Sequence, residues 1–236
     1  MKHVLVTGAG TGIGRATAIK FAKKGYKLTL FGRTAKTLSE VADVTGANYF
    51  LVDVSNEEEV KSGISSAIEQ NGDISILINN AGAAISAPLH RTDLAIWNSM
   101  IGVNLTGVYL CTRYALESLK KSSDSSIVNI ASTSGLIGYK YVTAYCAAKH
   151  GVIGFTKALA LEGIRVNAIC PGYTDTALYR DSIKRAAKKT GKSERQVENE
   201  FLGGKKLISP DDVASLVLEV SEDQSLNGQI KVIGDL

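Results

Sequence analysis

Short apolar runs alternate with helix-length segments along this 236-residue chain, and this alternation constrains the fold more than any other feature. Most of the runs are continuously apolar, which is typical of strands in a sheet that is covered on both faces. Seven runs predict strands, at Val4–Thr7, Lys27–Phe31, Tyr49–Val52, Ile74–Asn79, Ile127–Ala131, Arg165–Ile169 and Gln229–Ile233. Helical patterns fill the gaps, among them Gly12–Lys24, Glu57–Glu69, Leu94–Leu119, Thr143–Leu161 and Asp211–Val220.

Strands that are separated by helices need crossover connections, and these predict a parallel sheet. We therefore expect an α/β fold in which residues 1–236 form a single doubly wound domain around a seven-stranded parallel sheet. The charged segment 173–206 breaks the alternation and is long enough for two short helices over the carboxyl edge of the sheet. We interpret it as a substrate lid, with a plain surface excursion as the alternative.

The composition is that of an ordinary globular protein, with 44% hydrophobic and 21% charged residues. The net charge of +4 is scattered apart from a basic stretch at 184–189, which we interpret as a solvated helix face and not as a nucleic-acid footprint. Cys111, Cys146 and Cys170 lie in apolar stretches without metal-ligand spacing, so we expect free thiols and no metal site. The N-terminal apolar run is too short for a signal peptide or membrane span, which favours a cytoplasmic protein without a membrane partner.

A glycine-rich turn, Thr7-Gly8-Ala9-Gly10-Thr11-Gly12-Ile13-Gly14, joins the first predicted strand to the first predicted helix. Glycines let the backbone approach a ligand closely, and the free N–H groups of the helix attract an anion. A pyrophosphate is the expected guest, because the turn lies between a strand and a helix, the context that such a motif needs. A tight turn without a ligand is the alternative.

Tyr145 and Lys149 are four residues apart in a helical stretch and therefore share one helix face. A phenol ionises near pH ~10, and a neighbouring ammonium would favour the phenolate and lower that pKa. Ser132 follows the fifth predicted strand, where a hydroxyl points to the carboxyl edge of the sheet and can hold a substrate oxygen beside Tyr145. Without Ser132, the tyrosine and lysine would be unremarkable surface neighbours.

These motifs resemble the short-chain dehydrogenase/reductase family over nearly the whole chain. The resemblance rests on Gly8-x-x-x-Gly12-x-Gly14 and on Tyr145-x-x-x-Lys149, with Ser132 thirteen positions before Tyr145. It implies a Rossmann-type fold, hydride transfer between a nicotinamide and a carbonyl or secondary alcohol, and a homodimer or homotetramer. Within the family, the chain looks most like reductases of 3-oxoacyl thioesters carried by ACP or CoA.

The choice of coenzyme depends on Arg33 at the end of the second strand. NAD enzymes place a carboxylate near this position, whereas a guanidinium can fork onto a 2′-phosphate. NADP(H) is therefore favoured and NAD(H) possible, with an exposed, uncommitted arginine as the alternative reading. Asp53 resembles the family's residue at the adenine, although it could equally cap the helix that begins near Asn56.

The resemblance also implies roles for further residues. Asn104 joins Ser132, Tyr145 and Lys149 in the expected catalytic group by bending its helix and holding a water, with a buried structural hydrogen bond as the alternative. Ser134 is expected to contact the substrate together with Ser132 and Tyr145. The expected coenzyme contacts are Gly8, Thr11, Gly12, Ile13, Gly14, Arg33, Asp53, Val54, Asn80, Ala81, Gly82, Tyr145, Lys149, Pro171, Gly172, Thr174 and Thr176.

Taken together, these patterns predict an NADP(H)-dependent oxidoreductase for a 3-oxoacyl thioester or a related 3-oxo compound. One alternative is a secondary-alcohol or sugar-alcohol dehydrogenase. The other is a non-catalytic NADP(H)-sensing protein, although a sensor would not need a proton-transfer group. The expected partner is a small-molecule substrate.

Overall fold

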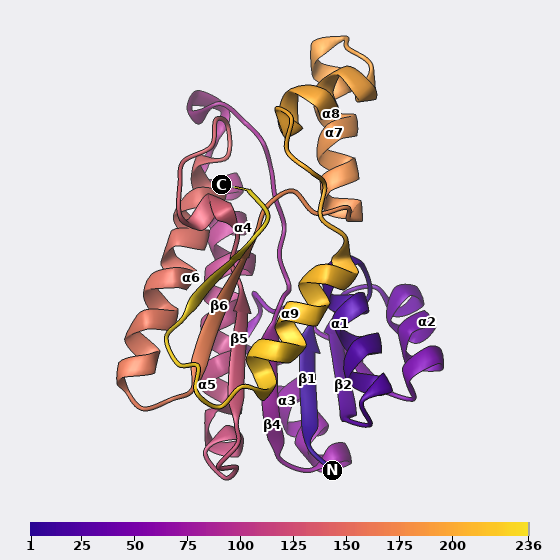
Figure 1. The fold of residues 1–236 in the computed structure, drawn as a ribbon, viewed down its shortest axis with the longest axis vertical. Helices are drawn as coiled ribbons and strands as arrows, with labels where there is room; N and C mark the ends of the chain where they lie inside the picture. The colour runs from indigo at the N-terminus through magenta and orange to yellow at the C-terminus, as the bar shows by residue number, and fades with distance from the viewer. Residues whose placement is uncertain (236) are drawn as a thin grey trace.

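The computed structural model describes residues 1–235 and has a seven-stranded, all-parallel sheet at its centre (Figure 1). The strand order is β3-β2-β1-β4-β5-β6-β7, so the chain changes direction across the sheet between β1 and β4. Ligands of such sheets bind outside the carboxyl ends of the strands at this switch point. The strands are β1 (His3–Thr7), β2 (Lys27–Gly32), β3 (Asn48–Leu51), β4 (Ile74–Asn79), β5 (Ser126–Ile130), β6 (Val166–Pro171) and β7 (Ile230–Ile233).

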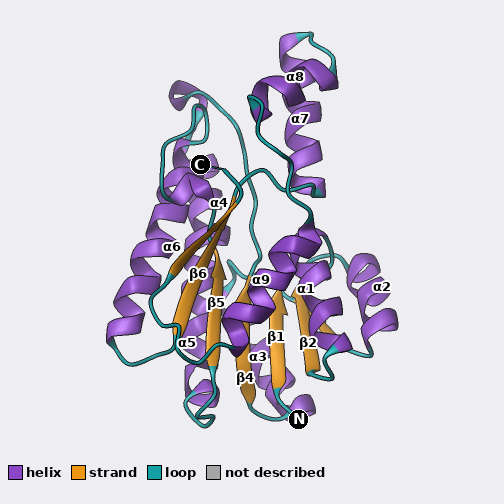
Figure 2. Cartoon of the chain, in the orientation of Figure 1, coloured by secondary structure: helices purple, strands orange, loops and turns teal. Residues whose placement is uncertain are grey.

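Helices cover both faces of the sheet, which confirms the doubly wound architecture (Figure 2). Helices α1, α2 and α9 pack on one face, while α3, α5 and α6 pack on the other. In β1, Val4 and Val6 point into the first core and Leu5 into the second, and all three are fully buried. These helices are α1 (Gly12–Lys23), α2 (Ala35–Thr45), α3 (Glu57–Asn71), α5 (Gly107–Leu119), α6 (Thr143–Leu161) and α9 (Pro210–Glu222).

Two helical regions differ from the sequence pattern. Helix α2 is not among the predicted ranges, although its buried Leu38 and Val41 are at helical spacing. The predicted helix Leu94–Leu119 is continuous, but the π turn η2 (Gly102–Thr106) interrupts its α-helical hydrogen bonding between α4 (Leu94–Ile101) and α5. By length and composition alone this helix could cross a membrane, yet α5 packs on β4 and α4 on α6, as core helices do.

The segment 173–206 forms the two helices expected of it, α7 (Ala177–Thr190) and α8 (Glu194–Leu202), which project beyond the carboxyl edge of the sheet (Figure 1). They share a small apolar core of their own. The basic stretch lies on α7 and is only partly a solvated face. Arg185 donates to the carbonyl of Ala84 at 3.3 Å, and Lys189 donates to that of Ser86 at 3.1 Å. These bonds tie α7 to the loop that follows β4.

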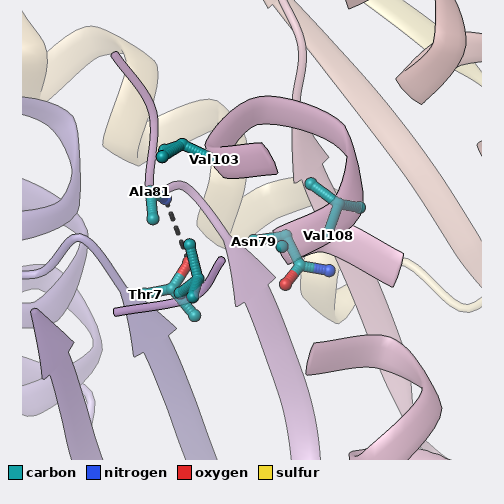
Figure 3. Close-up of a pocket in the computed structure, with 7 residues that line it drawn as sticks. Thr7, Asn79, Ala81, Val103 and Val108 are labelled. Carbon is teal, nitrogen blue, oxygen red and sulfur yellow. Dashed lines mark hydrogen bonds between the residues drawn. The ribbon is translucent and has the colours of Figure 1, made fainter. Parts of the chain in front are cut away.

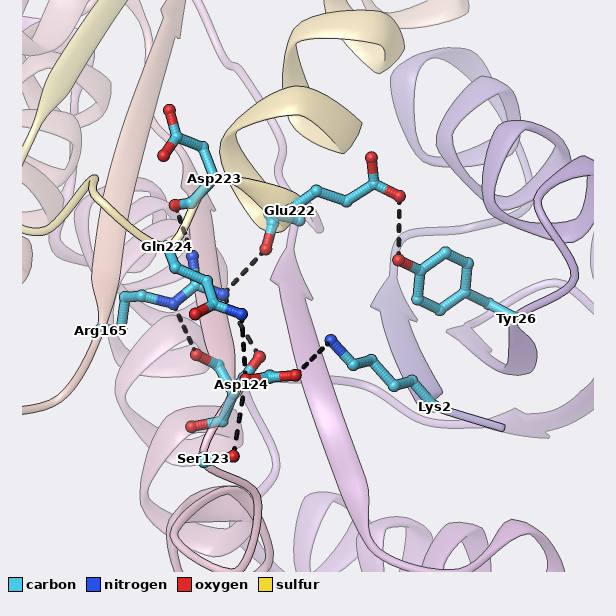
Figure 4. Close-up of polar contacts among 10 residues, drawn as sticks. Lys2, Tyr26, Ser123, Asp124, Arg165, Glu222, Asp223 and Gln224 are labelled. Carbon is cyan, nitrogen blue, oxygen red and sulfur yellow. Dashed lines mark hydrogen bonds and ion pairs between the residues drawn. The ribbon is translucent and has the colours of Figure 1, made fainter.

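The amino edge of the sheet is closed by a polar cluster around Arg165 (Figure 4). The guanidinium donates to the carbonyls of Ser125 at 2.8 Å, Ser221 at 2.8 Å and Asp223 at 2.9 Å. It thereby joins the start of β5 to the last carbonyls of α9. The cluster holds β5 and α9 together at the edge of the sheet opposite the switch point, so we assign it a structural role.

Candidate active site

The glycine-rich turn lies where β1 meets α1, at the switch point of the sheet. Thr11 is the N-cap of α1, and its side chain makes no capping hydrogen bond. Gly12 has a φ of +52°, and a Cβ there would lie 2.9 Å from the Cγ2 of Thr176. At Gly14 a Cβ would collide with the carbonyl oxygen of Gly8. The helix therefore presents open N–H groups in a turn that leaves no room for a side chain at Gly12 or Gly14, which fits a bound anion.

Thr7 and Asn80 join the ends of β1 and β4 directly beside this turn. The Thr7 hydroxyl accepts hydrogen bonds from the backbone N–H groups of Asn80 and Ala81, both at 3.0 Å, and Figure 3 shows the bond from Ala81. In return, the Asn80 amide donates to the carbonyls of Thr7 at 2.9 Å and Gly8 at 3.2 Å. Sequence reasoning missed this role of Thr7, although a threonine at the strand end just before Gly8 was a visible signal.

The residues drawn in Figure 3 line a small void beside the contact between Thr7 and Ala81. Thr7, Asn79 and Val54 are among them. The void has no room for a water molecule. Val54, an expected coenzyme contact, is 5% exposed and packs here against Gly107. The void is therefore a packing feature under the site and not a ligand pocket.

Arg33 and Asp53 lie together at the ends of β2 and β3, with 3.7 Å between the Arg33 Nη1 and the Asp53 Oδ2. Asp53 accepts hydrogen bonds from the backbone and the hydroxyl of Ser55, at 2.9 and 2.6 Å. Although burial opposes it, these bonds and the charge of Arg33 lower the pKa of Asp53. The alternative that Asp53 caps α3 is wrong, because Asn56 accepts from the N–H groups at that helix start.

Ser132, Tyr145 and Lys149 converge at the carboxyl end of β5. The Lys149 ammonium donates to the carbonyl of Ile130 at 2.7 Å and lies 5.7 Å from the centre of the Tyr145 ring. Ser132 forms a hydrogen bond with the Tyr145 phenol, and its hydroxyl also accepts from the N–H of Ser134 at 3.1 Å. A phenol, a hydroxyl and an ammonium are thus gathered at one strand end.

The spacing of Tyr145 and Lys149 suggested a lowered pKa for the tyrosine, but the pKa of Tyr145 is raised. Burial raises the pKa of Tyr145 to about 12, and the hydrogen bond with Ser132 opposes that rise only in part. Burial lowers the pKa of Lys149 to about 8. The ammonium bonds a backbone carbonyl and not the phenol, so the expected lowering of the Tyr145 pKa by Lys149 is wrong for this arrangement of residues.

Asn104 is fully buried in the π turn η2. Its amide donates to the carbonyls of Met100 and Ala83, both at 2.9 Å, and accepts from the N–H of Ala83 at 3.2 Å. A Cβ on Gly82 would lie 2.9 Å from the Asn104 oxygen and 3.8 Å from the Lys149 nitrogen. Asn104 therefore fixes the backbone beside Lys149, and the helix is distorted at this residue as the resemblance implied.

A chain of buried amides and hydroxyls runs beneath the site from β4 to α6. Asn79 donates to the Thr112 hydroxyl at 3.1 Å and to the Asn129 oxygen at 2.9 Å. Asn129 donates to the hydroxyl of Thr156 at 2.9 Å, and Thr156 donates to the carbonyl of Val152 at 2.8 Å. Because Lys149 is on the same helix as Thr156, this chain fixes α6 against β5.

The segment after β6 reaches the glycine-rich turn through Thr176. Its hydroxyl caps α7 by accepting from the N–H of Tyr179 at 3.2 Å. Thr174 is 7% exposed and donates to the carbonyl of Gly172 at 3.1 Å. Cys170, at the end of β6, is fully buried, and its raised pKa follows from that burial, which fits packing instead of nucleophilic attack.

A glycine-rich turn at the switch point, with a half-buried tyrosine and a buried lysine beside it, has the features of a dinucleotide-dependent α/β oxidoreductase. Comparison with known protein families matches residues 2–187 to the family described as short chain dehydrogenase. The chain therefore belongs to the short-chain dehydrogenase/reductase family, whose relatives act on CH–OH and keto groups. This confirms the resemblance read from the sequence.

Individual relatives cover nearly the whole chain. The D-beta-hydroxybutyrate dehydrogenase of Rhizobium meliloti (strain 1021) is 35% identical over 95% of this chain and 93% of its own length. The 3-oxoacyl-(acyl-carrier-protein) reductase FabG of Thermotoga maritima is 33% identical over 99% of this chain and 95% of its own. A variant of actinorhodin polyketide ketoreductase, crystallised with NADPH, superposes with a TM-score of 0.92 at 29% identity, covering 98% of this chain and 95% of that one.

Proposed function

We propose that this protein is an NADP(H)-dependent reductase that transfers a hydride between the nicotinamide and the carbonyl of a 3-oxoacyl thioester or a related 3-oxo compound. The observation that carries the proposal is the meeting of Tyr145, Ser132 and Lys149 at the carboxyl end of β5. A sensor that only binds coenzyme would not need this group. The relatives that act on 3-hydroxy and 3-oxo compounds support the substrate class.

The residues present fit a dinucleotide. The turn at Gly8, Gly12 and Gly14 leaves no room for side chains and ends at a helix start without a side-chain cap, which suits the pyrophosphate. Thr34, the N-cap of α2, likewise makes no side-chain capping bond, and the neighbouring Arg33 side chain is 67% exposed. A cation beside an open helix start suits a 2′-phosphate, which supports NADP(H) over NAD(H).

In the proposed mechanism the bound nicotinamide supplies the hydride, and the residues of this chain handle the substrate oxygen. Tyr145 donates its proton to that oxygen, and the Ser132 hydroxyl holds the oxygen in place. A pKa of about 12 keeps the Tyr145 phenol protonated at neutral pH, the form that reduction needs. When the coenzyme is bound, Lys149 would hold its ribose, Asn104 would order a water beside Lys149, and Thr174 and Thr176 would hold the carboxamide.

The setting of the enzyme is part of the proposal. Three free cysteines fit a reducing compartment such as the cytoplasm. Exposed apolar side chains on α4 and α5, namely Leu94, Trp97 and Tyr109, support burial of that face in a homodimer or homotetramer. The segment 173–206 acts as the lid over the substrate, because α7 is bonded to the loop after β4 across the carboxyl edge.

The test is consumption of NADPH and of NADH with a panel of 3-oxo esters, simple ketones and sugars. We expect NADPH to be oxidised with the 3-oxo esters. Arg33→Ser should raise the KM for NADPH about tenfold or more and leave that for NADH nearly unchanged, because only NADPH carries the 2′-phosphate. Equal KM changes for both coenzymes would contradict the NADP(H) assignment, and turnover of sugars alone would favour the sugar-alcohol alternative.

A further inference from the structure

A row of aromatic rings links the loop after η3 (Thr133–Gly135) to helices α7 and α8. The centres of the Tyr139 and Tyr173 rings are 6.4 Å apart at an angle of 71°, an edge-to-face contact. Tyr173 also lies 5.8 Å from Tyr179 and 6.3 Å from Phe201, which belong to the two helices. Tyr139 and Tyr173 remain half-buried, so part of each ring is left open to a ligand.

Both tyrosines are anchored beside Ser132. The Tyr139 hydroxyl donates to the hydroxyl of Thr133 at 3.2 Å, and Thr133 follows Ser132 directly. Tyr173 follows the end of β6, and β6 is bonded to the strand that leads into Ser132 through the Ala131 N–H and the Ile169 carbonyl, 2.8 Å apart. Both rings therefore belong to chain segments that adjoin Ser132.

The loop that carries Tyr139 is held in a fixed shape. The carbonyl of Tyr141 accepts from the N–H of Ala87 at 2.8 Å, which joins this loop to the one after β4. Tyr141 has a φ of +67°, a strained conformation for a residue other than glycine, and strain of this kind persists where the surroundings enforce it. Ile85 and Ile137, one on each of these loops, are about 40% exposed and extend the apolar surface.

Buried cations that could hold a substrate carboxylate are scarce on this side, and Lys140, which follows Tyr139, is exposed to solvent. Within residues 1–235, Lys149 is the only buried side chain that carries a full charge, and its ammonium bonds the Ile130 carbonyl. Arg185 and Lys189 donate to carbonyls of the loop after β4. A substrate carboxylate enclosed in this site would lose its hydration without gaining a buried ion pair, which is costly.

We propose that the Tyr139–Tyr173 pair binds the substituent that the 3-oxo carbon carries on the side opposite the ester or thioester. The pair selects substrates in which this substituent is aromatic or bulky and apolar and in which the ester or thioester is uncharged. Free short-chain 3-oxo acids are poorer substrates than their esters. This assignment rests on the proposed function, because it presumes that Tyr145 and Ser132 meet the carbonyl oxygen. It adds which substituent the enzyme accepts.

Three probes that share the 3-oxo carbonyl separate size from charge: ethyl benzoylacetate, ethyl acetoacetate and acetoacetate. With NADPH and the wild-type protein, we expect kcat/KM to fall about tenfold from the first probe to the second, and about tenfold again to the third. Tyr173→Ala should bring the first two probes to near parity. Tyr173→Phe should preserve the preference, because it retains the ring.

Matched control variants distinguish the loss of a ring that binds substrate from a disturbance of the packing of α7 and α8. Phe201→Leu removes a neighbour of Tyr173 without touching Tyr139, and it should leave the order of the probes unchanged. Tyr139→Leu attacks the pair from the other loop and should abolish the aryl preference as Tyr173→Ala does. NADPH affinity and Tm of each variant show whether it is folded, and a poorly folded Tyr173→Ala leaves Tyr139→Leu to decide.

Two results would overturn the assignment: acetoacetate used as efficiently as ethyl benzoylacetate, or an aryl preference that survives in both Tyr173→Ala and Tyr139→Leu. If none of the three probes is reduced while another class of carbonyl is, the subsite assignment fails and the hydride-transfer activity stands. If no carbonyl is reduced with either coenzyme, the proposed function itself fails.

Discussion

Lys149 is buried and Tyr145 half-buried, and the loss of hydration moves their pKa values in opposite directions, to about 8 and about 12. Both shifts favour the uncharged form, because an ion loses its hydration when it is buried. For Tyr145 that form is the acid. A tyrosine at the same spacing on an open helix face would keep a pKa near 10, so the raised pKa of Tyr145 comes from its surroundings and not from its spacing to Lys149.

His3 gives a prediction about stability at the residue scale. It is 1% exposed, its ring lies 2.8 Å from the Gly72 carbonyl and 2.9 Å from the Thr29 hydroxyl, and burial lowers its pKa below 6.5. The unfolded chain therefore binds a proton that the folded chain resists. Stability from this residue is complete above pH 6.5 and is lost as the pH falls through that value toward the folded pKa.

We expect the free energy of unfolding of the wild type to decline between about pH 7 and about pH 5, a window above the titration of ordinary carboxylates. His3→Gln should lack this component, since an amide does not titrate. Urea unfolding across the window measures it, with the exposed His90→Gln as control. Parallel curves for the wild type and His3→Gln would contradict the assignment.

At the scale of elements, the buried chain from Asn79 through Asn129 to Thr156 connects two strands to α6. Each member uses a neighbour as its hydrogen-bond partner, and the last reaches the carbonyl of Val152 in the preceding helical turn. The helix that presents Tyr145 and Lys149 is thus held to β5 by polar contacts as well as by packing. Loss of one member leaves a buried partner unsatisfied.

Thr156→Val keeps the shape of the side chain but removes the hydroxyl that receives the Asn129 amide. We expect a loss of about 1–3 kcal/mol in the free energy of unfolding. Thr190→Val is the matched control, because Thr190 also bonds a carbonyl four residues earlier in a helix but is exposed. If both variants lost the same free energy of unfolding, burial of the amide chain would add nothing to stability.

The strands and the glycine-rich turn were predictable because each has a local sequence pattern. The strands are continuous apolar runs, and the turn is a cluster of glycines. The π turn at Asn104 was not predictable, since it depends on the Ala83 backbone, twenty-one residues away. Helix α2 was predictable too, since Leu38, Val41 and Ala42 repeat at helical spacing, but that signal was overlooked. The pKa direction of Tyr145 and the contact of Tyr139 with Tyr173 depend on burial and on loops from different strands, which spacing does not encode.

At the scale of the whole molecule, the two edges of the sheet have different tasks. The carboxyl edge gathers the glycine-rich turn and Tyr145, whereas the amino edge is closed by Arg165 (Figure 4). Arg165 lies between the start of β5 and the end of α9, and it donates hydrogen bonds to backbone carbonyls at both. Its contribution should therefore be to stability alone.

Arg165→Met retains much of the side-chain bulk but leaves these carbonyls without their donor. We expect it to lower the free energy of unfolding by about 2–3 kcal/mol and to leave kcat/KM unchanged at temperatures where the protein is folded. Urea unfolding and steady-state kinetics test this, with the exposed Arg195→Met as control. A fall in kcat/KM without a loss of stability would contradict the division of tasks between the edges.

The central claim is that the phenol of Tyr145 protonates the substrate oxygen while hydride leaves the coenzyme. Single-turnover oxidation of bound NADPH by a 3-oxo ester, followed in a stopped-flow instrument for the wild type and Tyr145→Phe, tests it most directly. The variant should bind NADPH with nearly unchanged affinity and transfer hydride at least about a hundredfold more slowly, because the proton donor is gone. Hydride transfer at the wild-type rate in Tyr145→Phe would contradict the account.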